Sequence, residues 1–348
     1  MPTTFDFSQA LLDWYDLYGR KDLPWQQEPT PYHVWLSEIM LQQTQVSTVI
    51  DYYQRFLGRF PDIQALAKAP QDEVLAYWSG LGYYARARNL HKTARIIVED
   101  YDGDMPASLE ALTGLPGIGR STAGAILTLA FHQCYPILDG NVKRVLARFF
   151  AIEGWPGIKQ VENQLWLRAE SLLPKQRIAN YIQAQMDLGA TLCTRTKPDC
   201  PHCPLQTQCQ AYILGQPEAY PGKKPRKAIP VRHTQWLIMQ NELGEVLLEQ
   251  RPSQGIWGGL WSFPEISPDE DISSYCGRYR QIEIQSSTAL ASLQHVFTHF
   301  RLNIQPTLLR CRVSGVADKD QSKWYRIEDT FKLGLPAPVK SFLKSFNE

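Results

Sequence analysis

The segment LTGLPGIGRSTAGAIL, residues 112–127, decides how the first half of this chain is organised. Pro116, Gly117 and Gly119 predict a tight turn between two stretches whose apolar residues recur at helical spacing. Such a turn exposes backbone N–H groups at a helix N-terminus, where a phosphate can bind without a charged side chain. Because similar turns join helices in many other proteins, this segment indicates phosphate binding only together with further signals.

Both sides of this turn predict more helices. Apolar residues recur every three or four positions through most of residues 7–215, as in VWLSEIMLQQTQV at 34–46 and RNLHKTARIIVEDY at 88–101. From Ala219 the chain becomes rich in Pro, Gly, Lys and Arg, which predicts a linker. Runs of β-favouring residues follow, in 234–252 and 300–313.

These changes predict a multidomain protein. We expect an all-α helical catalytic region at 1–218 with a helix–hairpin–helix at about 108–130, a linker at 219–231 and an α+β domain at 232–348. A length of 348 residues agrees with this division, because it exceeds the usual size of one hydrophobic core.

Composition limits how the protein binds its partners. A formal net charge of +1 excludes a protein that wraps nucleic acid by bulk attraction, so any contact with DNA must be local. The sequence has no apolar run near the ~20 residues that cross a bilayer, and no secretory signal begins it. We therefore expect a cytoplasmic, nucleoid-associated protein that does not bind membranes.

Four of the seven cysteines lie close together, at Cys193, Cys200, Cys203 and Cys209. In a chain without a secretory signal such clustering indicates metal ligation rather than disulfide bonds. Four thiolates suit tetrahedral zinc or an iron–sulfur cluster. The C-x6-C-x2-C-x5-C spacing has one close pair where zinc ribbons have two, and this favours the iron–sulfur cluster. The other three cysteines are expected to be core residues.

An aspartate follows the hairpin by some twenty residues, in ILDGNVKRVLARF at 137–149. Asp139 precedes a helix with Lys143, Arg144 and Arg148, and its simplest role is to cap that helix. A catalytic role can coexist with capping.

The order of LPGIG, LDGNVKR and the cysteine loop resembles the endonuclease-III-like, helix–hairpin–helix superfamily of DNA glycosylases. Within it, WLSEIMLQQTQV, GLGYYARARNL, GRSTAGAI and LDGNVKRV are similar to the MutY-type adenine DNA glycosylases. The resemblance spans nearly the whole chain. It implies one [4Fe-4S] cluster and hydrolysis of the bond between deoxyribose and adenine mispaired with 8-oxoguanine or guanine, the first step of base excision repair.

The resemblance also assigns catalytic residues. It implies that Glu38 donates a proton to adenine, that Asp139 stabilises the sugar cation of the transition state, and that Asn141 belongs to the site. Apolar neighbours around Glu38 should raise its pKa, which suits a general acid. For an isolated glutamate, a solvated helix face is the ordinary alternative. Sequence leaves open whether Asp139 bonds to the sugar or only pairs with it.

One position separates hydrolysis from strand cleavage. Relatives that cut the backbone carry a lysine nucleophile after the hairpin, and Ser121 stands there in this chain. Its hydroxyl implies attack by water without Schiff-base formation, although Lys143 remains an amine that could support weak strand cleavage.

The resemblance implies DNA contacts at two further places in the helical region. Gln42, Gln43 and Tyr83 resemble the residues that probe the duplex once the base is extruded. The remaining predicted DNA-binding residues lie in the hairpin turn, in the pocket or near phosphates: Arg86, Leu115, Gly117, Gly119, Ser121 and Lys143. For an exposed arginine or a core tyrosine, ordinary structural roles are the alternative.

The C-terminal half resembles a Nudix-like domain, because WGGLWSFPEI at 257–266 is similar to the start of that fold. The carboxylate-rich helix of the diphosphohydrolases does not follow it, so we expect recognition of 8-oxoguanine rather than hydrolysis. By resemblance the reading loop is HVFTHFRL at 295–302, with Phe297, Thr298 and His299. Threonine stands where many relatives have serine, and it keeps the hydroxyl.

Two alternatives remain. The first is a glycosylase for pyrimidine lesions that also cuts the strand, which Ser121 and the Nudix-like tail disfavour. The second is a non-catalytic DNA-binding or iron–sulfur redox protein, which the presence of both Glu38 and Asp139 disfavours. Of partners, the sequence implies double-stranded DNA with an adenine mispair, bound by a monomer.

Overall fold

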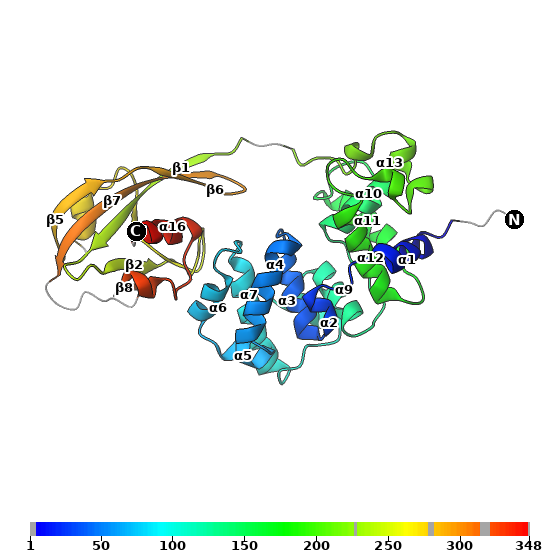
Figure 1. The fold of residues 1–348 in the computed structure, drawn as a ribbon, viewed down its shortest axis with the longest axis horizontal. Coiled ribbons are helices and arrows are strands. Elements are labelled where there is room, and N and C mark those ends of the chain that lie inside the picture. The colour runs from blue at the N-terminus through cyan, green and yellow to red at the C-terminus, as the bar shows by residue number, and fades with distance from the viewer. Residues whose placement is uncertain (1–4, 226–227, 278–281, 314–320, 347–348) are drawn as a thin grey trace. The chain divides into compact units, whose positions relative to one another are not determined.

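The computed structural model describes residues 5–225, 228–277, 282–313 and 321–346 (Figure 1). The chain forms two compact units, one of Met1–Ala67 with Lys92–Arg226 and the other of Lys68–His91 with Lys227–Glu348. The sequence analysis placed residues 68–91 in the helical region, whereas in the structure they pack with the C-terminal residues. Two residues of the predicted linker, 226 and 227, lie outside the described ranges.

The first unit is helical, as the sequence predicts. Its helices are α1 (Phe7–Tyr18), α2 (Pro24–Gln27), α3 (Pro31–Leu41), α4 (Val46–Arg59), α8 (Leu109–Gly114), α9 (Arg120–Leu129), α10 (Gly140–Phe149), α11 (Lys159–Ser171), α12 (Ile178–Thr191) and α13 (Gln210–Ile213). Helices α5 (Ile63–Lys68) and α7 (Ala85–Asp100) cross the boundary between the units. Short 3-10 turns η1 (Cys200–His202), η2 (Gln206–Gln208) and η3 (Pro217–Ala219) follow α12.

A core between α1, α10, α11 and α12 carries the helix that begins at Asp139. Val142, Val145, Leu146 and Phe149 recur at helical spacing on α10 and are buried. Phe149 packs edge-on against Phe7 of α1, with ring centroids 4.8 Å apart. This packing fixes α10, and with it the side chains at its N-terminus.

The predicted hairpin is present between α8 and α9. Gly117 has a φ of +82°, a conformation that favours glycine. The Thr93 hydroxyl donates to the Pro116 carbonyl at 2.9 Å and ties the turn to α7. Gly119 precedes α9 as its N-cap, so the first N–H groups of α9 face outward beside the turn.

The second unit is α+β, in agreement with the predicted fold class. Its strands are β1 (Val231–Gln240), β2 (Val246–Gln250), β3 (Trp261–Ser262), β4 (Glu265–Ile266), β5 (Ile282–Ala289), β6 (Leu293–Val296), β7 (Arg301–Val313) and β8 (Ser322–Tyr325). Its helices are α6 (Gln71–Trp78), α14 (Ile272–Cys276), α15 (Ile327–Thr330) and α16 (Ala337–Ser345).

The sheet is mixed, in the order β3-β2-β1-β7-β5, with β4 on β1, β6 on β7 and β8 on β2. Strands β1 and β7 are parallel over their whole paired length, from Val231 opposite Arg301 to Gln240 opposite Arg310. Leu237 and Met239 alternate along β1 and share a core with Leu309 and Cys311 of β7. The sheet therefore holds the loop between β6 and β7 at the start of the long strand β7. Among the described residues, no helix is long and apolar enough to cross a membrane.

Candidate active site

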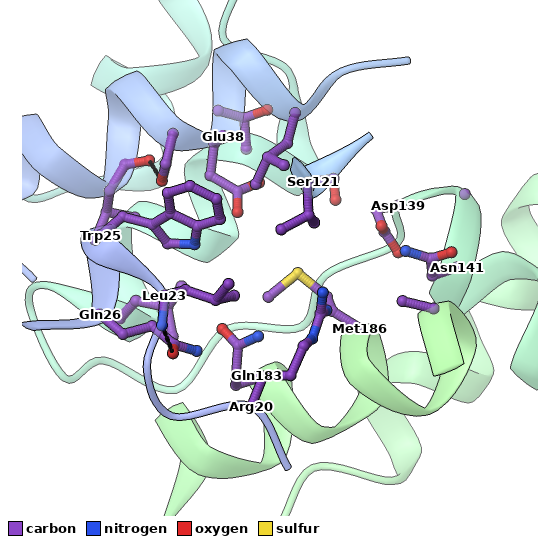
Figure 2. Close-up of a pocket in the computed structure, with 18 of the residues that line it drawn as sticks. Arg20, Leu23, Trp25, Gln26, Glu38, Ser121, Asp139, Asn141, Gln183 and Met186 are labelled. Carbon is purple, nitrogen blue, oxygen red and sulfur yellow. Dashed lines mark hydrogen bonds between the residues drawn. The ribbon is translucent and has the colours of Figure 1, made fainter. Parts of the chain in front are cut away.

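A pocket of about 1210 Å³ lies in the helical unit and contains both predicted catalytic carboxyls (Figure 2). Its walls come from α3, α9, α10, α12 and the segments that follow α1 and α3. Figure 2 shows Ser121 between Glu38 and Asp139 in that view, with Gln183 and Met186 of α12 below them. The structure therefore brings together residues that are about a hundred positions apart in the sequence.

Glu38 enters the pocket from α3. This helix starts at the N-cap Thr30, whose hydroxyl accepts the N–H of His33, and its neighbours Trp35, Leu36 and Ile39 are buried. Burial, and to a smaller extent the nearby charge of Asp139, raise the pKa of the Glu38 carboxyl to about 8. Glu38 is therefore protonated at neutral pH, as a general acid must be.

Asp139 faces the same pocket as the N-cap of α10. Its carboxylate accepts the N–H of Val142 at 2.7 Å, so the capping role that the sequence predicts is present. Burial raises the pKa of Asp139, while the hydrogen bonds from Val142 and Asn141 and the charges of Arg144 and Lys143 lower it. Asp139 therefore receives hydrogen bonds and nearby positive charges that favour its ionised form, whereas the charge of Asp139 disfavours ionisation of Glu38.

Ser121 holds the segment that carries Asp139. Its hydroxyl oxygen accepts the N–H of Leu138 at 3.0 Å. Ser121 lies in the first turn of α9, directly after the hairpin, so this bond joins the hairpin to the residue before Asp139. Position 121 therefore carries a hydroxyl and no lysine amine.

Asn141 and Arg144 connect the pocket to the cysteine loop. The Arg144 guanidinium donates to Asn141 Oδ1 at 2.9 Å and to the carbonyl of Gly189 at 2.6 Å. Its Nε also donates to the carbonyl of Cys193 at 2.7 Å. One half-buried side chain thus ties the first turn of α10 to α12 and to the first cysteine.

Gln42 and Gln43 follow Glu38 at the end of α3 and both line the pocket. Gln42 is half-buried and Gln43 is exposed. Gln43 has a φ of +59°, which a residue with a Cβ rarely adopts. Backbone strain of this kind is concentrated at functional sites.

The other predicted DNA-binding residues of the helical unit lie on two surfaces. Gly117 and Gly119 are exposed in the hairpin, whereas Leu115 is buried beneath the turn. Lys143 forms an ion pair with Glu162, with Nζ and Oε1 2.8 Å apart. Its amine is therefore held by a carboxylate of α11.

Tyr83 and Arg86 belong to the second unit. Tyr83 is exposed and has a φ of +49°. Arg86 is buried and donates to the carbonyls of Leu81 and Gly82, and burial lowers its pKa to about 10. The guanidinium lies inside the turn that presents Tyr83, rather than outside where a phosphate would meet it.

The four clustered cysteines line one small cavity between α10, α12 and the 3-10 turns. Arg148 of α10 is buried against them, with Nη1 3.3 Å from Cys193 Sγ and 2.7 Å from the Thr194 carbonyl. Within the described ranges no three His, Cys, Asp or Glu side chains are arranged to hold a single metal ion.

Phe297, Thr298 and His299 form the turn between β6 and β7. The Phe297 ring stacks on the buried Phe300 at 4.4 Å, and the Phe297 N–H donates to the Phe300 carbonyl at 2.9 Å. Thr298 and His299 are exposed at the tip, with Oγ1 and Nδ1 3.4 Å apart. The hydroxyl and the imidazole are therefore presented to solvent on a turn that is supported by the stacked rings of Phe297 and Phe300.

The pocket also contains residues that the sequence analysis missed. Arg20 binds the fully buried Asp187 through Nε and Nη2, at 2.9 and 2.6 Å, and Gln183 Nε2 donates to the same carboxylate at 2.9 Å. Trp25 and Gln26 of α2 face them (Figure 2). Gln26 Nε2 is buried without a hydrogen-bond partner in the described part of the chain. A Pro-Trp pair after a short loop was the only signal available in the sequence.

The chain matches two family models. Residues 36–171 match the HhH-GPD superfamily of base excision DNA repair proteins, and residues 235–345 match the NUDIX domain. These spans contain the two predicted catalytic carboxyls and the predicted reading loop, respectively.

Solved structures are similar to the helical part. A thermostable thymine-DNA glycosylase is 29% identical with a TM-score of 0.54, covering 60% of this chain and 95% of its own. A non-covalent complex of endonuclease III with DNA has the same fold, at 20% identity and a TM-score of 0.52, covering 60% of this chain and 94% of its own.

Curated relatives cover the whole chain. The adenine DNA glycosylase of Buchnera aphidicola subsp. Acyrthosiphon pisum is 41% identical over 99% of both chains. That of Mus musculus is 39% identical over 98% of this chain and 78% of its own. With the hairpin, the paired carboxyls and the Nudix-like domain in place, this chain belongs to the adenine DNA glycosylases, helix–hairpin–helix hydrolases of N-glycosyl bonds.

Proposed function

We propose that this protein releases adenine mispaired with 8-oxoguanine or guanine in duplex DNA by hydrolysis and so starts base excision repair. The observation that supports this most strongly is the pair Glu38 and Asp139, which share one pocket and differ in what surrounds them. Two carboxyls whose environments separate their pKa values provide one acid and one anion.

Glu38 supplies the proton. Adenine leaves poorly as an anion, so its departure requires protonation of the ring. With a pKa of about 8, Glu38 carries its proton at neutral pH and lies within the pocket that an extruded base would enter. After the base departs, the Glu38 carboxylate can accept a proton from the attacking water.

Asp139 stabilises the positive charge that develops on the sugar. Its carboxylate is fixed by the Val142 N–H, and Ser121 fixes the preceding residue through the Leu138 N–H. A charge that is already oriented need not reorganise during the reaction, which is the main source of electrostatic catalysis. Both a covalent sugar–Asp139 adduct and an ion pair are compatible with this position.

The same geometry favours hydrolysis over strand cleavage. Strand cleavage needs an amine that attacks the sugar, and the position after the hairpin carries the Ser121 hydroxyl instead. Lys143 is on the helix of Asp139, but its ammonium pairs with Glu162 at 2.8 Å. We therefore propose a monofunctional enzyme.

The extruded adenine fits the part of the pocket near α2 and α12. The Trp25 ring offers an apolar face for the base, and the buried amide of Gln26 offers a donor that has no partner among the described residues. Gln183 lies across the pocket and is held by Asp187. An unsatisfied donor next to an aromatic face suits a ring nitrogen of a purine.

DNA is bound by backbone amides more than by a broad basic surface. The exposed turn of Gly117 and Gly119 with the N-terminus of α9 suits one phosphate, which agrees with the net charge of +1. Gln42 and Gln43 fill the gap left by the extruded base, and Tyr83 enters the duplex beside the partner base. Thr298 and His299 read 8-oxoguanine from their exposed turn.

The four cysteines fit one [4Fe-4S] cluster. They line a single cavity, and Arg148 places a cation against Cys193, which would offset the negative charge of four thiolates. The cluster would cross-link the loop after α12, and the proposed hydrolysis needs no electron transfer. This loop carries Arg195, which lines the active-site pocket, and Lys197 in a left-handed conformation with a φ of +50°.

Cys200→Ser is expected to lower affinity for a duplex with an uncleavable adenine analogue by about tenfold or more, because ligand loss frees the loop that presents Arg195. Helical content, measured by circular dichroism, should stay close to that of the wild type. Cys134→Ser, at an exposed cysteine outside the cavity, is the matched control. Unchanged affinity after loss of iron would reject this role for the cluster.

The function itself is tested with four duplexes that place adenine opposite 8-oxoguanine, guanine, cytosine or thymine. We expect free adenine from the first two and little from adenine opposite thymine, without strand scission until alkali is added. Release of a pyrimidine lesion, or scission without alkali, would support the alternative with strand-cleaving activity. No release of any base would support the non-catalytic alternative.

A further inference from the structure

The C-terminal domain binds the Lys68–His91 segment directly, although the two are far apart in the sequence. Asp72, in the first turn of α6, is the clearest contact. Its carboxylate accepts from Gln250 Nε2 at 2.7 Å and from the indole N–H of Trp261 at 3.2 Å. Trp261 is buried, so this bond satisfies an indole that solvent does not reach.

A second group of contacts lies at the other end of α6. The Ser79 hydroxyl and the Tyr84 hydroxyl both donate to the carbonyl of Leu335, at 3.1 and 3.3 Å. Arg88 Nη1 donates to the Gly258 carbonyl at 2.5 Å. These bonds lie on both sides of residues 80–83.

The two parts also pack closely. A Cβ added to Gly334 would lie 2.8 Å from the Leu75 Cβ, closer than real Cβ atoms approach. A Cβ on Gly259 would lie 3.4 Å from both Gln71 Nε2 and Leu75 Cδ1. The absence of a side chain at Gly334 is therefore what lets α6 lie against the loop that precedes α16.

Residues 80–83 lie between these hydrogen-bonded residues and form the turn that exposes Tyr83. Gly80 and Gly82 have φ values of +102° and +77°, and Tyr83 itself has +49°. The Trp78 indole N–H donates to the Gly82 carbonyl at 3.0 Å, and the Arg86 guanidinium lies 5.5 Å from the centre of the Tyr83 ring. A left-handed backbone at a residue with a Cβ persists only where its surroundings hold it.

We propose that Asp72 and the Leu335 carbonyl are positioning groups through which the C-terminal domain sets Tyr83 relative to the reading turn at 297–299. The proposal rests on the proposed function, in which Tyr83 enters the duplex beside the partner base. Because Tyr83 and the reading turn then move as one body, recognition of the partner base and insertion of the tyrosine occur together. Asp72 thereby acts on specificity without touching DNA.

Two variants loosen this attachment in different ways. Asp72→Asn keeps the shape of the side chain, but its amide group presents a donor to Gln250 or Trp261, which are themselves donors. Gly334→Ala removes no hydrogen-bonding group, but its Cβ would meet Leu75 and displace α6 sterically. Asp269→Asn removes one charge from an exposed position of the same unit and is the matched control.

The first measurement is fluorescence of 2-aminopurine placed next to 8-oxoguanine in a duplex with an uncleavable adenine analogue. Insertion of Tyr83 should unstack the probe and raise its emission in the wild type and in Asp269→Asn. The rise should be lost in Tyr83→Ala and reduced in Asp72→Asn and Gly334→Ala. This readout requires binding but no base release, so it decides the inference even if the proposed reaction fails.

The second measurement is the ratio of single-turnover rates with adenine opposite 8-oxoguanine and opposite guanine. Asp72→Asn is expected to lower this ratio about tenfold, since small displacements of a positioned group have effects of this order. Combined with Tyr83→Ala it should add nothing further, because Asp72 acts through Tyr83. Additive effects, or a lower melting temperature with an unchanged ratio and probe signal, would overturn the proposal.

Discussion

Glu38→Gln is expected to slow the single-turnover release of adenine from an 8-oxoguanine duplex by about 10²–10⁴-fold, the usual contribution of a general acid. Glutamine has the same shape and fills the same place on α3, but its amide cannot give up a proton to adenine. The rate is measured with enzyme in excess over labelled duplex, so that product release does not limit it. Binding of an uncleavable duplex should be nearly unchanged.

The pH profile of the wild type tests the same proton. Since the pKa of Glu38 is about 8, the rate should be steady near neutrality and fall about tenfold per pH unit above 8, as the acid form is lost. On the acid side it should fall as Asp139 becomes protonated. Glu99→Gln, at an exposed position on α7, is the control and should keep both limbs. An alkaline limb that persists in Glu38→Gln would assign the proton to another group.

Asp139→Asn is expected to lower the same rate by about 10²–10³-fold, as removal of a fixed transition-state charge does in other enzymes. Asparagine is as good an N-cap as aspartate, so α10 and the bond to Val142 should remain. Affinity for an uncleavable duplex should hold or rise, because a negative charge near DNA is lost. The rate and the affinity are measured on the same preparation.

Asp139→Ala separates the two roles of this residue. It removes the cap as well as the charge, and loss of a cap destabilises a protein by about 1 kcal/mol. We expect Asp139→Ala to be as slow as Asp139→Asn but to melt at a lower temperature. If Asp139→Asn kept most of its rate, capping would be the whole role of Asp139.

The sequence predicted the elements that depend on local pattern. The apolar spacing of 142–149 indicates a helix, and Asp139 before it indicates a cap, because both signals come from neighbours along the chain. The hairpin glycines and the clustered cysteines are local signals in the same sense. Glu38 was different, since only the resemblance distinguished it from a surface glutamate.

What the sequence could not predict depends on contacts between distant residues. The ion pair of Arg20 with Asp187 joins two positions with no pattern of their own, and it forms only once α12 lies beside the segment after α1. Likewise, nothing in 68–91 indicates packing with the C-terminal domain, because Asp72 meets Trp261 through a fold that local spacing does not encode. Arg86 looked like a surface cation until its carbonyl partners were visible.

The proton on Glu38 also has a consequence for the balance between the folded and unfolded chain. An unfolded glutamate has a pKa near 4.5, whereas here it is about 8, so between these values folding takes up a proton from solution. The contribution of this site to stability is fully present below pH 4.5, declines as the pH rises from 4.5 to about 8, and is lost above pH 8. The enzyme thus meets DNA with the carboxyl of Glu38 already protonated, and through this site its folded state is less stable above pH 8 than in acid.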